Sequence, residues 1–369
     1  MTTVGLDLAY LAPGATGGME TYARALVPAL AAARPQLRFV VFAGRELAGE
    51  LRAAPWVDGL RVATLPVSSD TRVRRTVVEQ ALLPAYVRRA GVDLVHSLGN
   101  TAPLAPLGVP LVLTLHDLIW ARMPETHSGL LARGLGVLVP PAVRRAARVI
   151  APSEATKRDA VELLGTPPEK VAVVPQGPGL LGGVEPVSEV ELRARLGLGD
   201  GPLVLCPAPK RAHKNVVRLA QAMAGLDATL VVPGYPAKGV DADLEVEGAR
   251  VVRAGWVSDA ELEGLYAAST LLAFPSLAEG FGLPVVEAMR RGLPVACADA
   301  TSLPEVAGDA ALLFDPLDVR SIRGAVQRLL DDAALRGTLA ERGRAQAARF
   351  TWEATARGTL AVYDAVLGA

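Results

Sequence analysis

The sequence has 369 residues, enough for two domains of ordinary size, and its formal net charge is zero. This balance argues against wholesale binding of nucleic acid, which usually requires a strongly basic chain. No uncharged apolar run reaches about 18 residues, so we expect no membrane span. The N-terminus lacks the basic and apolar regions of a signal peptide. We therefore expect a cytoplasmic protein whose contact with the inner membrane face is at most peripheral.

Short β-rich runs alternate with helical patterns along the whole chain. Apolar runs of this kind, bounded by turns and separated by helices, predict an α/β fold with parallel sheets covered on both faces, that is, two doubly wound, Rossmann-like domains. Ser188 and Ser258 are each followed three residues later by glutamate, which is the capping-box pattern of a helix start. The expected strands are 4–11, 37–44, 60–67, 93–98, 111–117, 148–153, 171–176, 203–209, 229–235, 251–257, 271–276, 294–299 and 311–316, with helices such as 19–33 and 74–90 between them.

The periodic pattern stops in the glycine- and proline-rich stretch 176–189, which predicts a domain boundary. We expect one domain over 1–180 and a second over 181–350. The last segment, 351–369, reads as a terminal amphipathic helix.

The sequence carries no convincing metal-binding pattern. Cys206 and Cys297 lie in different apolar runs, so we expect two buried free thiols rather than a disulfide or a zinc site. Asp241 and Asp243 have the Asp-x-Asp spacing but lie in a polar loop. We expect no metal and no other cofactor.

Two strand ends carry residues suited to an anion. Gly17 and Gly18 stand directly before a helix, where bare N–H groups and the helix dipole favour a phosphate; a plain turn is the alternative. Lys210, Arg211 and Lys214 lie between a strand and a helix. Three cations there suit a diphosphate, and a solvated basic loop is the alternative.

The segment 278–289, AEGFGLPVVEAM, raises the sharpest question. Gly280 and Gly282 expose N–H groups before a helix that Pro284 can open. We expect Glu287 in the first turn of this helix, accepting hydrogen bonds from vicinal hydroxyls, and Glu279 reaching further hydroxyls. Carboxylates that only cap the helix are the alternative. Carboxylates around an anion-binding turn suit a ligand with an anionic middle and hydroxylated ends.

Histidines at strand ends are the other candidates. His116 and Asp117 end a strong apolar strand, and His116 could donate a hydrogen bond to a ligand with Asp117 orienting it; a hydrogen-bonded turn histidine is the alternative. His96 and His127 are better explained as structural residues.

One dinucleotide-like pattern is rejected. Gly177, Gly179 and Gly182 match G-x-G-x-x-G after a strand, but no helix starts until about residue 188, whereas the fingerprint needs the helix at once. We expect a linker there.

Together these residues resemble glycosyltransferase family 4, retaining enzymes of the GT-B fold, in which an interdomain cleft separates two Rossmann-like domains. The resemblance covers nearly the whole chain. Its most specific element is Glu279-Gly-Phe-Gly-Leu-Pro-Val-Val-Glu287, the paired-glutamate motif. Supporting segments are 17–18, 116–117, 151–159, 213–215, 255–257 with the SDAELEGLYAAS that follows, and 302–316.

The resemblance implies a role for each candidate. His116 would face the donor sugar near the reacting carbon, Glu279 would bind that sugar, and Glu287 would bind the ribose hydroxyls. Lys214 and Arg211 would bind the diphosphate and stabilise its developing charge. The other donor-binding residues would be Gly17, Gly18 and Lys210 near the diphosphate, Val257 near the nucleobase, and Gly280, Phe281, Gly282 and Leu283 through their N–H groups.

Two departures from the family pattern matter. The family's arginine before the lysine has no exact counterpart, so Lys210 or Arg211 would fill the role, and we favour Arg211. The usual Pro-Asn-Gly is Pro175-Gln176-Gly177 here, which puts the contact of that loop in doubt.

The resemblance implies transfer of a hexose-type sugar from a nucleotide-sugar donor, GDP-mannose or a UDP-sugar, to an acceptor hydroxyl without a metal. The acceptor would be a small molecule, an oligosaccharide or a lipid-linked sugar, bound mainly by the N-terminal domain, on which the terminal helix would pack. The alternatives are a nucleotide-sugar epimerase or hydrolase of similar fold and a non-catalytic nucleotide-sugar-binding protein. A nicotinamide oxidoreductase is the weakest reading because the fingerprint fails.

Overall fold

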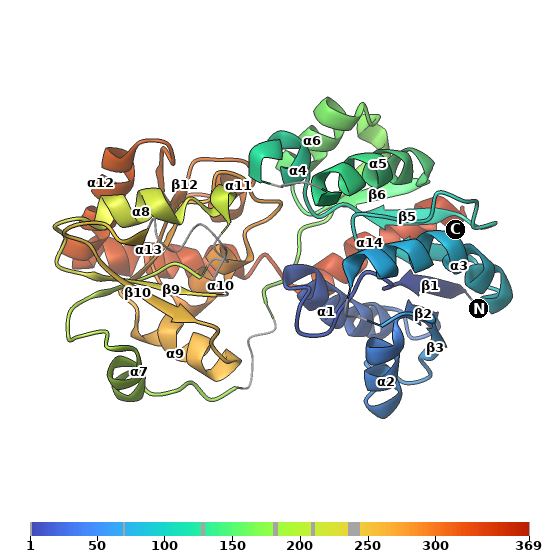
Figure 1. Cartoon of the computed structure of the whole chain (residues 1–369), viewed down its shortest axis with the longest axis horizontal. Coiled ribbons are helices and arrows are strands. Elements are labelled where there is room, and N and C mark those ends of the chain that lie inside the picture. Colours follow the sequence, from blue (N-terminus) through green and yellow to red (C-terminus); the bar gives the residue numbers. More distant parts are fainter. Residues whose placement is uncertain are drawn as a thin grey trace. The chain divides into compact units, whose positions relative to one another are not determined.

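The computed structural model describes residues 2–68, 71–126, 130–179, 184–207, 211–234 and 244–368. The chain divides into two compact units, each built on one parallel sheet. Unit 1 comprises Met1–Gly177 together with Thr351–Ala369, and unit 2 comprises Pro178–Phe350 (Figure 1).

The sheet of unit 1 has the strand order β3-β2-β1-β4-β5-β6-β7, all parallel. The order reverses between β1 and β4, and doubly wound domains bind ligands at the carboxyl ends of strands at such a reversal. The strands are β1 (Thr3–Asp7), β2 (Arg38–Ala43), β3 (Arg61–Thr64), β4 (Leu94–Ser97), β5 (Leu111–Thr114), β6 (Arg148–Ala151) and β7 (Val171–Val173). The helices are α1 (Gly18–Ala33), α2 (Arg45–Ala53), α3 (Arg72–Ala90), α4 (Ile119–Arg122), η1 (Pro124–Thr126), α5 (Leu130–Arg145), α6 (Glu154–Leu164), η2 (Pro168–Lys170) and α14 (Trp352–Leu367).

Apolar side chains cover both faces of this sheet. On β2, Phe39 and Val41 belong to one buried cluster, and Val40 and Phe42 belong to another, as the two-residue period of a strand requires. Helix α14 contributes Tyr363 and neighbouring residues to the first cluster and packs against α1 (Figure 1). The last helix is therefore part of the core of unit 1.

The sheet of unit 2 has the order β10-β9-β8-β11-β12-β13, again parallel, with its reversal between β8 and β11. One buried cluster spans the unit. The strands are β8 (Leu203–Leu205), β9 (Thr229–Pro233), β10 (Arg250–Gly255), β11 (Leu271–Phe274), β12 (Val295–Ala298) and β13 (Ala311–Phe314). The helices are α7 (Glu189–Leu196), η3 (Ala212–Lys214), α8 (Val216–Met223), α9 (Asp259–Ala268), α10 (Leu283–Arg291), α11 (Leu303–Ala307), α12 (Val319–Asp331) and α13 (Ala333–Ala347).

The thirteen strands expected from sequence are confirmed, and most end earlier than expected. The expected strand 111–117 ends at Thr114, so His116 lies beyond the sheet and its side chain is not bound by strand alternation. Ser258 forms the full capping box with Glu261. At Ser188 only the bond from the Glu191 N–H to the serine oxygen is present.

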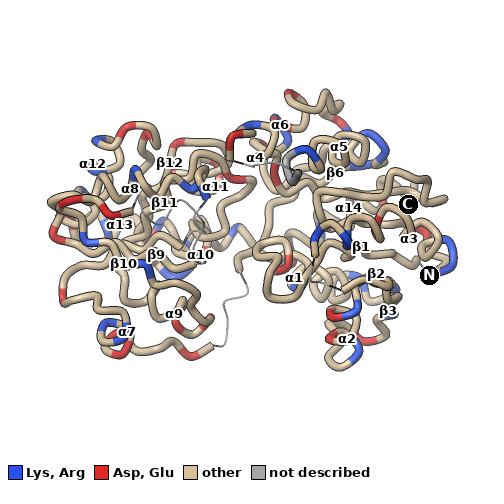
Figure 2. Tube along the Cα trace, viewed as in Figure 1, with Lys and Arg blue, Asp and Glu red and all other residues tan. Residues whose placement is uncertain are grey.

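The charges and thiols follow the composition. Lysine and arginine are interspersed with aspartate and glutamate along both units (Figure 2). Cys206 and Cys297 are buried free thiols, as expected, and burial raises the pKa of each to about 12. Within the described residues no helix is long and apolar enough to cross a membrane.

Candidate functional site

In unit 2, the turn that follows β11 presents backbone N–H groups at the start of α10. Gly282 precedes the helix with φ 110°, a conformation that favours glycine, and a Cβ there would lie 2.7 Å from Leu303 Cδ2. Pro284 occupies the first turn, as expected. The N–H groups of Gly282 and Leu283 donate to none of the described residues. The turn therefore holds donors suited to an anion.

Lys214 and Glu279 form an ion pair beside this turn. Lys214 Nζ lies 2.5 Å from Glu279 Oε1, and the two side chains are 13% and 11% exposed. The ammonium group also lies 5.4 Å from the centroid of the Phe274 ring. A cation and a carboxylate that sequence reasoning assigned to one ligand thus neutralise each other.

The loop that carries Lys214 is fixed to the loop after β11. Asn215 adopts φ 57°, which is uncommon for a residue other than glycine, and its side-chain amide donates to the carbonyls of Pro275 at 3.1 Å and Pro316 at 2.7 Å. The Leu277 N–H donates to the His213 carbonyl at 2.8 Å. These bonds place Lys214 close to Glu279.

Glu279 is also held through its backbone. Its N–H donates to Thr301 Oγ1 at 2.9 Å, and Ser302 Oγ lies 3.0 Å from its carbonyl and 2.8 Å from that of Phe281. Thr301 has φ 48°, so it too adopts the left-handed conformation. Sequence reasoning missed both residues, because no local pattern marks a threonine that will adopt this conformation.

Glu287 does not lie in the first turn of α10, and that expectation was wrong. The helix starts at Leu283, so Glu287 is its fifth residue, and the first turn holds no acidic residue. Tyr266 donates its hydroxyl to Glu287 Oε2 at 2.8 Å. Burial raises the pKa of Glu287, while bonds from Tyr266 and the Gly179 N–H oppose this shift. A Cβ on Gly179 would lie 1.9 Å from Glu287 Oε1, so a larger residue there would push this carboxylate from its place.

The remaining unit 2 candidates are placed less tightly. The Arg211 side chain is exposed and forms no hydrogen bond or ion pair with the described residues. Val257, the second residue after β10, is half-buried against the core. Lys210, like Asp241 and Asp243, lies outside the described residues.

In unit 1, His116 is buried between the ends of β4 and β7. Its ring Nε2 lies 2.7 Å from the Leu98 carbonyl, and its ring Nδ1 lies 3.3 Å from Gln176 Nε2. Its backbone N–H donates to Asn100 Oδ1 at 2.7 Å. The ring meets Tyr22 edge to face, with centroids 4.9 Å apart. Burial lowers the pKa of His116. His127 lies outside the described residues.

Asp117 does not orient His116, contrary to expectation. Its Oδ1 accepts from the Ile119 N–H at 3.2 Å, a local turn contact. Leu98, Gln176 and Asn100 hold the histidine instead. They lie 16 to 60 positions from His116 along the chain, so only the tertiary fold could reveal these contacts.

Gly17 and Gly18 are exposed at the start of α1. Gly17 has φ 64°, and a Cβ on it would meet no atom within 4 Å. Glu20 in the first turn accepts from the Gly14 N–H at 2.9 Å and pairs with Arg24. This carboxylate orders the preceding loop and leaves the two glycines at the surface.

Two buried carboxylates lie at the carboxyl edge of the unit 1 sheet. Asp7 accepts from the Ala9 N–H at 3.1 Å and from Ser97 Oγ at 3.0 Å. Glu79 accepts from Thr101 Oγ1 at 3.1 Å. Burial raises the pKa of both carboxyl groups. Both carboxylates belong to a buried hydrogen-bond network of unit 1, and the sequence analysis did not predict it.

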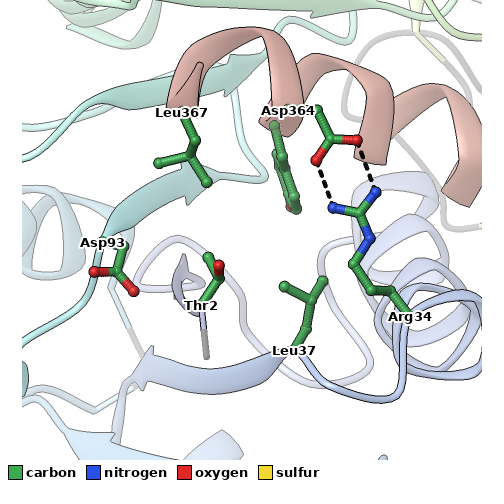
Figure 3. Close-up of a pocket in the computed structure, with 7 residues that line it drawn as sticks. Thr2, Arg34, Leu37, Asp93, Asp364 and Leu367 are labelled. Atoms are coloured by element: carbon green, nitrogen blue, oxygen red, sulfur yellow. Dashed lines mark hydrogen bonds and ion pairs between the residues drawn. The ribbon is translucent and has the colours of Figure 1, made fainter. Parts of the chain in front are cut away.

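A cavity of about 380 Å³ lies where β1 and β4 begin, at the edge opposite His116 (Figure 3). Arg34 from the end of α1 forms a two-pronged ion pair with Asp364 of α14 at 2.5 and 2.7 Å. This pair ties α14 to α1, far from the strand ends at which ligands of this fold bind. The other lining residues are Thr2, Leu37, Asp93, Tyr363 and Leu367.

Two family models match the chain in succession. Residues 16–178 match Glycosyltransferase Family 4, and residues 189–346 match Glycosyl transferases group 1. A curated relative from Mycolicibacterium hassiacum, an MMP alpha-(1->4)-mannosyltransferase, is 30% identical over 306 residues, which cover 75% of this chain and 71% of the relative. The chain belongs to glycosyltransferase family 4. It is a retaining glycosyltransferase, as the sequence indicated.

Other comparisons agree with family 4. The O-antigen chain mannosyltransferase B of Escherichia coli is 47% identical over 109 residues, which span 30% of this chain and only 29% of that relative. Anabaena HepE, solved in complex with UDP-glucose, superposes with a TM-score of 0.72 at 22% identity and covers 98% of this chain and 100% of its own. The expected GT-B fold of the family 4 enzyme is confirmed.

No group of three or more histidine, cysteine, aspartate or glutamate side chains in the described parts of this family 4 chain could hold a metal ion. The charged groups beside the α10 turn are Lys214 and its partner Glu279, and Arg211 lies directly before η3.

Proposed function

We propose that this glycosyltransferase moves a hexose, with mannose from GDP-mannose the favoured case and a UDP-sugar the other, to an acceptor hydroxyl without a metal. Unit 2 binds the donor, and unit 1 binds the acceptor, which is a small molecule, an oligosaccharide or a lipid-linked sugar. The observation that carries the proposal is the Lys214–Glu279 pair beside the N–H groups of Gly282 and Leu283, which donate to none of the residues that the structure describes.

The chemistry of a nucleotide sugar matches these groups. Its diphosphate is an anion for Lys214, Arg211 and the N–H groups of the α10 turn. Its two hydroxylated ends suit the two carboxylates, Glu279 for the sugar and Glu287 for the ribose. Lys214 and Glu279 are paired with each other. A ligand that brings an anion to the lysine and hydroxyls to the glutamate offers each group a new partner in place of the ion pair that it interrupts.

The other donor contacts in the proposal follow the family pattern. Gly17 and Gly18 approach the diphosphate, and Val257 lies by the nucleobase. Lys210 stays part of the proposal as an alternative to Arg211. Gly280, Phe281, Gly282 and Leu283 contribute backbone donors.

The reaction that fits retention is a same-face displacement. The bond between the anomeric carbon and the diphosphate oxygen breaks, and its electron pair stays on that oxygen. The acceptor oxygen bonds to the anomeric carbon on the same face, and its proton passes to the leaving phosphate. Lys214 and Arg211 stabilise the charge that develops on the diphosphate. His116 borders the sugar on the unit 1 side.

The preference for mannose rests on relatives. The two curated relatives named above are mannosyltransferases. The match to mannosyltransferase B spans under a third of either chain, so the full activity of that relative is not assigned to this chain. The donor base is therefore the first property to measure.

The test is calorimetric titration with GDP, UDP, dTDP, ADP and their common sugars in the presence of EDTA. We expect tight binding of one diphosphate by the wild type and at least tenfold weaker binding by Glu287→Ala. Glu245→Ala, an exposed carboxylate in the same unit, is the control and keeps wild-type affinity. If no nucleotide binds, or if Glu287→Ala binds as well as wild type, the site assignment is wrong.

A further inference from the structure

The His116 ring has both nitrogens engaged within unit 1. Nε2 lies 2.7 Å from the Leu98 carbonyl, and a carbonyl can only accept, so Nε2 carries a hydrogen. Burial lowers the pKa of His116, which favours the neutral ring. In a neutral ring with hydrogen on Nε2, Nδ1 is a bare acceptor.

Gln176 supplies the donor that this acceptor needs. Its Nε2 lies 3.3 Å from His116 Nδ1, and the Gln176 side chain is buried. Because Nδ1 is an acceptor, the amide must present its NH₂ end to the ring. The Leu98 carbonyl therefore determines the histidine tautomer, and the tautomer determines the amide orientation.

Helix α14 fixes the backbone on both sides of Gln176. Thr355 Oγ1 donates to the Pro175 carbonyl at 2.8 Å. Gly177 lies against the indole of Trp352, where a Cβ would come within 2.7 Å of the ring, so only glycine fits. The Gln176 side chain is thus directed at the histidine by two contacts that do not involve it.

The other groups around His116 do not compete for its nitrogens. Tyr22 on α1 contacts the ring by its edge, and the same tyrosine meets Trp352 at a centroid distance of 5.8 Å. The neighbouring titratable groups in the described residues are Tyr22, His96 on β4 and Asp117, which is turned to the Ile119 N–H. No described carboxylate bonds to either ring nitrogen of His116.

We propose that Gln176 is a positioning residue that, together with the Leu98 carbonyl, holds His116 as the neutral Nε2–H tautomer, so that the histidine meets the substrate as a hydrogen-bond acceptor and not as an acid. The 3.3 Å bond is long for N–H donation, so it exchanges readily for a stronger donor. The substrate group that His116 recognises is therefore a hydroxyl that donates its hydrogen and displaces the Gln176 amide. The recognition of a substrate hydroxyl rests on the proposed function, whereas the assignment of the His116 tautomer does not.

The first test is ¹⁵N NMR of histidine-labelled protein without substrate. The chain has four histidines, so His116→Phe assigns the His116 signals. We expect wild-type His116 to show hydrogen on Nε2 and a hydrogen-bonded, bare Nδ1 from pH 6 to pH 8. In Gln176→Ala the Nδ1 signal should move to that of an acceptor without a donor. A wild-type ring with hydrogen on Nδ1, or an unchanged Nδ1 signal in Gln176→Ala, overturns the proposal.

The second test is Gln176→Glu, which replaces the donor by a carboxylate that can only accept. The ring must then take a proton on Nδ1, so its titration should move upward by at least about one pH unit. The kcat/KM for transfer should then rise with pH between 6 and 8, where the wild type is flat, and Gln176→Ala should lose about tenfold in kcat at all pH values. Gln80→Glu is the matched control, because Gln80 bonds to Ala102 and Leu104 and does not touch His116. A Gln176→Glu profile identical to wild type contradicts the proposal.

The two hypotheses fail separately. If the wild type binds no nucleotide, the proposed function is wrong, yet the substrate-free NMR still reports on the tautomer. If the wild type transfers sugar but the tautomer is the other one, only the role of Gln176 is wrong. Unfolding midpoints within a few degrees of wild type show that each variant is folded.

Discussion

The two candidate sites satisfy their polar groups in different ways. In unit 2, opposite charges neutralise each other at partly exposed positions, as Lys214 and Glu279 do. In unit 1, neutral groups form buried hydrogen bonds, as His116 does with Leu98 and Gln176. A charge pair can open for a ligand that carries its own charges, whereas a buried neutral network is costly to break. The first arrangement suits a site that must change partners, and the second keeps its groups in place except where a substrate replaces a long bond, as proposed for Gln176 and His116.

The strongest test of this contrast distinguishes two roles of Lys214, which are to supply a cation to the diphosphate and to neutralise Glu279. Lys214→Ala should lower the transfer rate by about 10²–10³-fold, because one cation at the leaving diphosphate is lost. It should also lower the free energy of unfolding by roughly 1–3 kcal/mol, because Glu279 keeps its charge without a partner. The measurements are initial rates and urea unfolding.

The double variant Lys214→Met with Glu279→Gln removes both charges. It should recover most of the lost stability and none of the activity. Lys157→Ala in unit 1 is the control for losing a lysine. If the double variant regains activity, the pair serves only to stabilise unit 2.

In unit 1, removing a buried neutral hydrogen-bond partner should lower the free energy of unfolding more than removing a charge at the surface does. His96 bonds to the Tyr363 hydroxyl at 2.7 Å through Nδ1 and to Thr114 Oγ1 at 2.8 Å through Nε2. His96→Leu leaves both partners buried without it and should cost roughly 2–4 kcal/mol in urea unfolding. A cost below that of Tyr363→Phe, which removes one bond, would contradict this account.

The same residue predicts a pH dependence. Burial lowers the pKa of His96 to about 3, whereas the unfolded value is near 6.5. Between these values the unfolded chain binds more protons, so wild-type stability is present above pH 6.5 and falls as the pH drops toward 3. His96→Leu should remove this part of the slope, measured as the difference between the two unfolding curves from pH 5 to pH 8.

Asp7 should show the opposite sign. Burial raises the pKa of its carboxyl group, so the folded state binds more protons than the unfolded state above the unfolded value, and stability falls as the pH rises through this range. Asp7→Asn should therefore raise the unfolding free energy at pH 7 by roughly 1–3 kcal/mol. The amide can still accept from Ala9 and can donate to Ser97 Oγ, which itself donates to the Thr101 carbonyl at 2.6 Å.

The control for Asp7 is Asp227→Asn, an exposed aspartate of unit 2 that should change nothing. Equal stability of Asp7→Asn and wild type at pH 7, with a gain only below pH 5, would mean that the fold lowers the pKa of this carboxyl group, and it would contradict the prediction.

The smallest effect is expected for the ion pair that joins α1 to α14. Arg34 and Asp364 are 28% and 33% exposed, more than twice the exposure of the Lys214–Glu279 pair. A double-mutant cycle with alanine at both positions should give a coupling below about 1 kcal/mol, and 0.5 M salt should reduce it. A coupling above that of Lys214 and Glu279, measured in the same way, would break the contrast between exposed and partly buried pairs.

Sequence reasoning predicted the strands well and the contacts around the site less well. Buried parallel strands are apolar runs bounded by turns, so segments such as 229–235 and 271–276 could be recognised locally. The expected place of Glu287 was wrong by about one residue, because α10 begins at Leu283, directly after Gly282 in the left-handed conformation, and Glu287 then falls just past the first turn. Gln176 and Thr301 could not have been assigned their partners, since His116 and Glu279 reach them only through the folded chain. Local pattern identified the reactive residue types, and tertiary packing decides what each one touches.

The chain order of unit 1 has a consequence for synthesis. Helix α14, which supplies Tyr363 to His96 and Thr355 to Pro175, follows the whole of unit 2 in the chain. At translation rates of about 5–20 residues per second, the ribosome needs on the order of 10 s or more to make residues 178–350. During that interval unit 2 can complete its sheet, while the nascent unit 1 still exposes the apolar side chains that α14 covers. A chain cut short before α14 should therefore still fold unit 2, with its Lys214–Glu279 pair. Its unit 1 would keep apolar side chains exposed, and chaperones would bind the chain there.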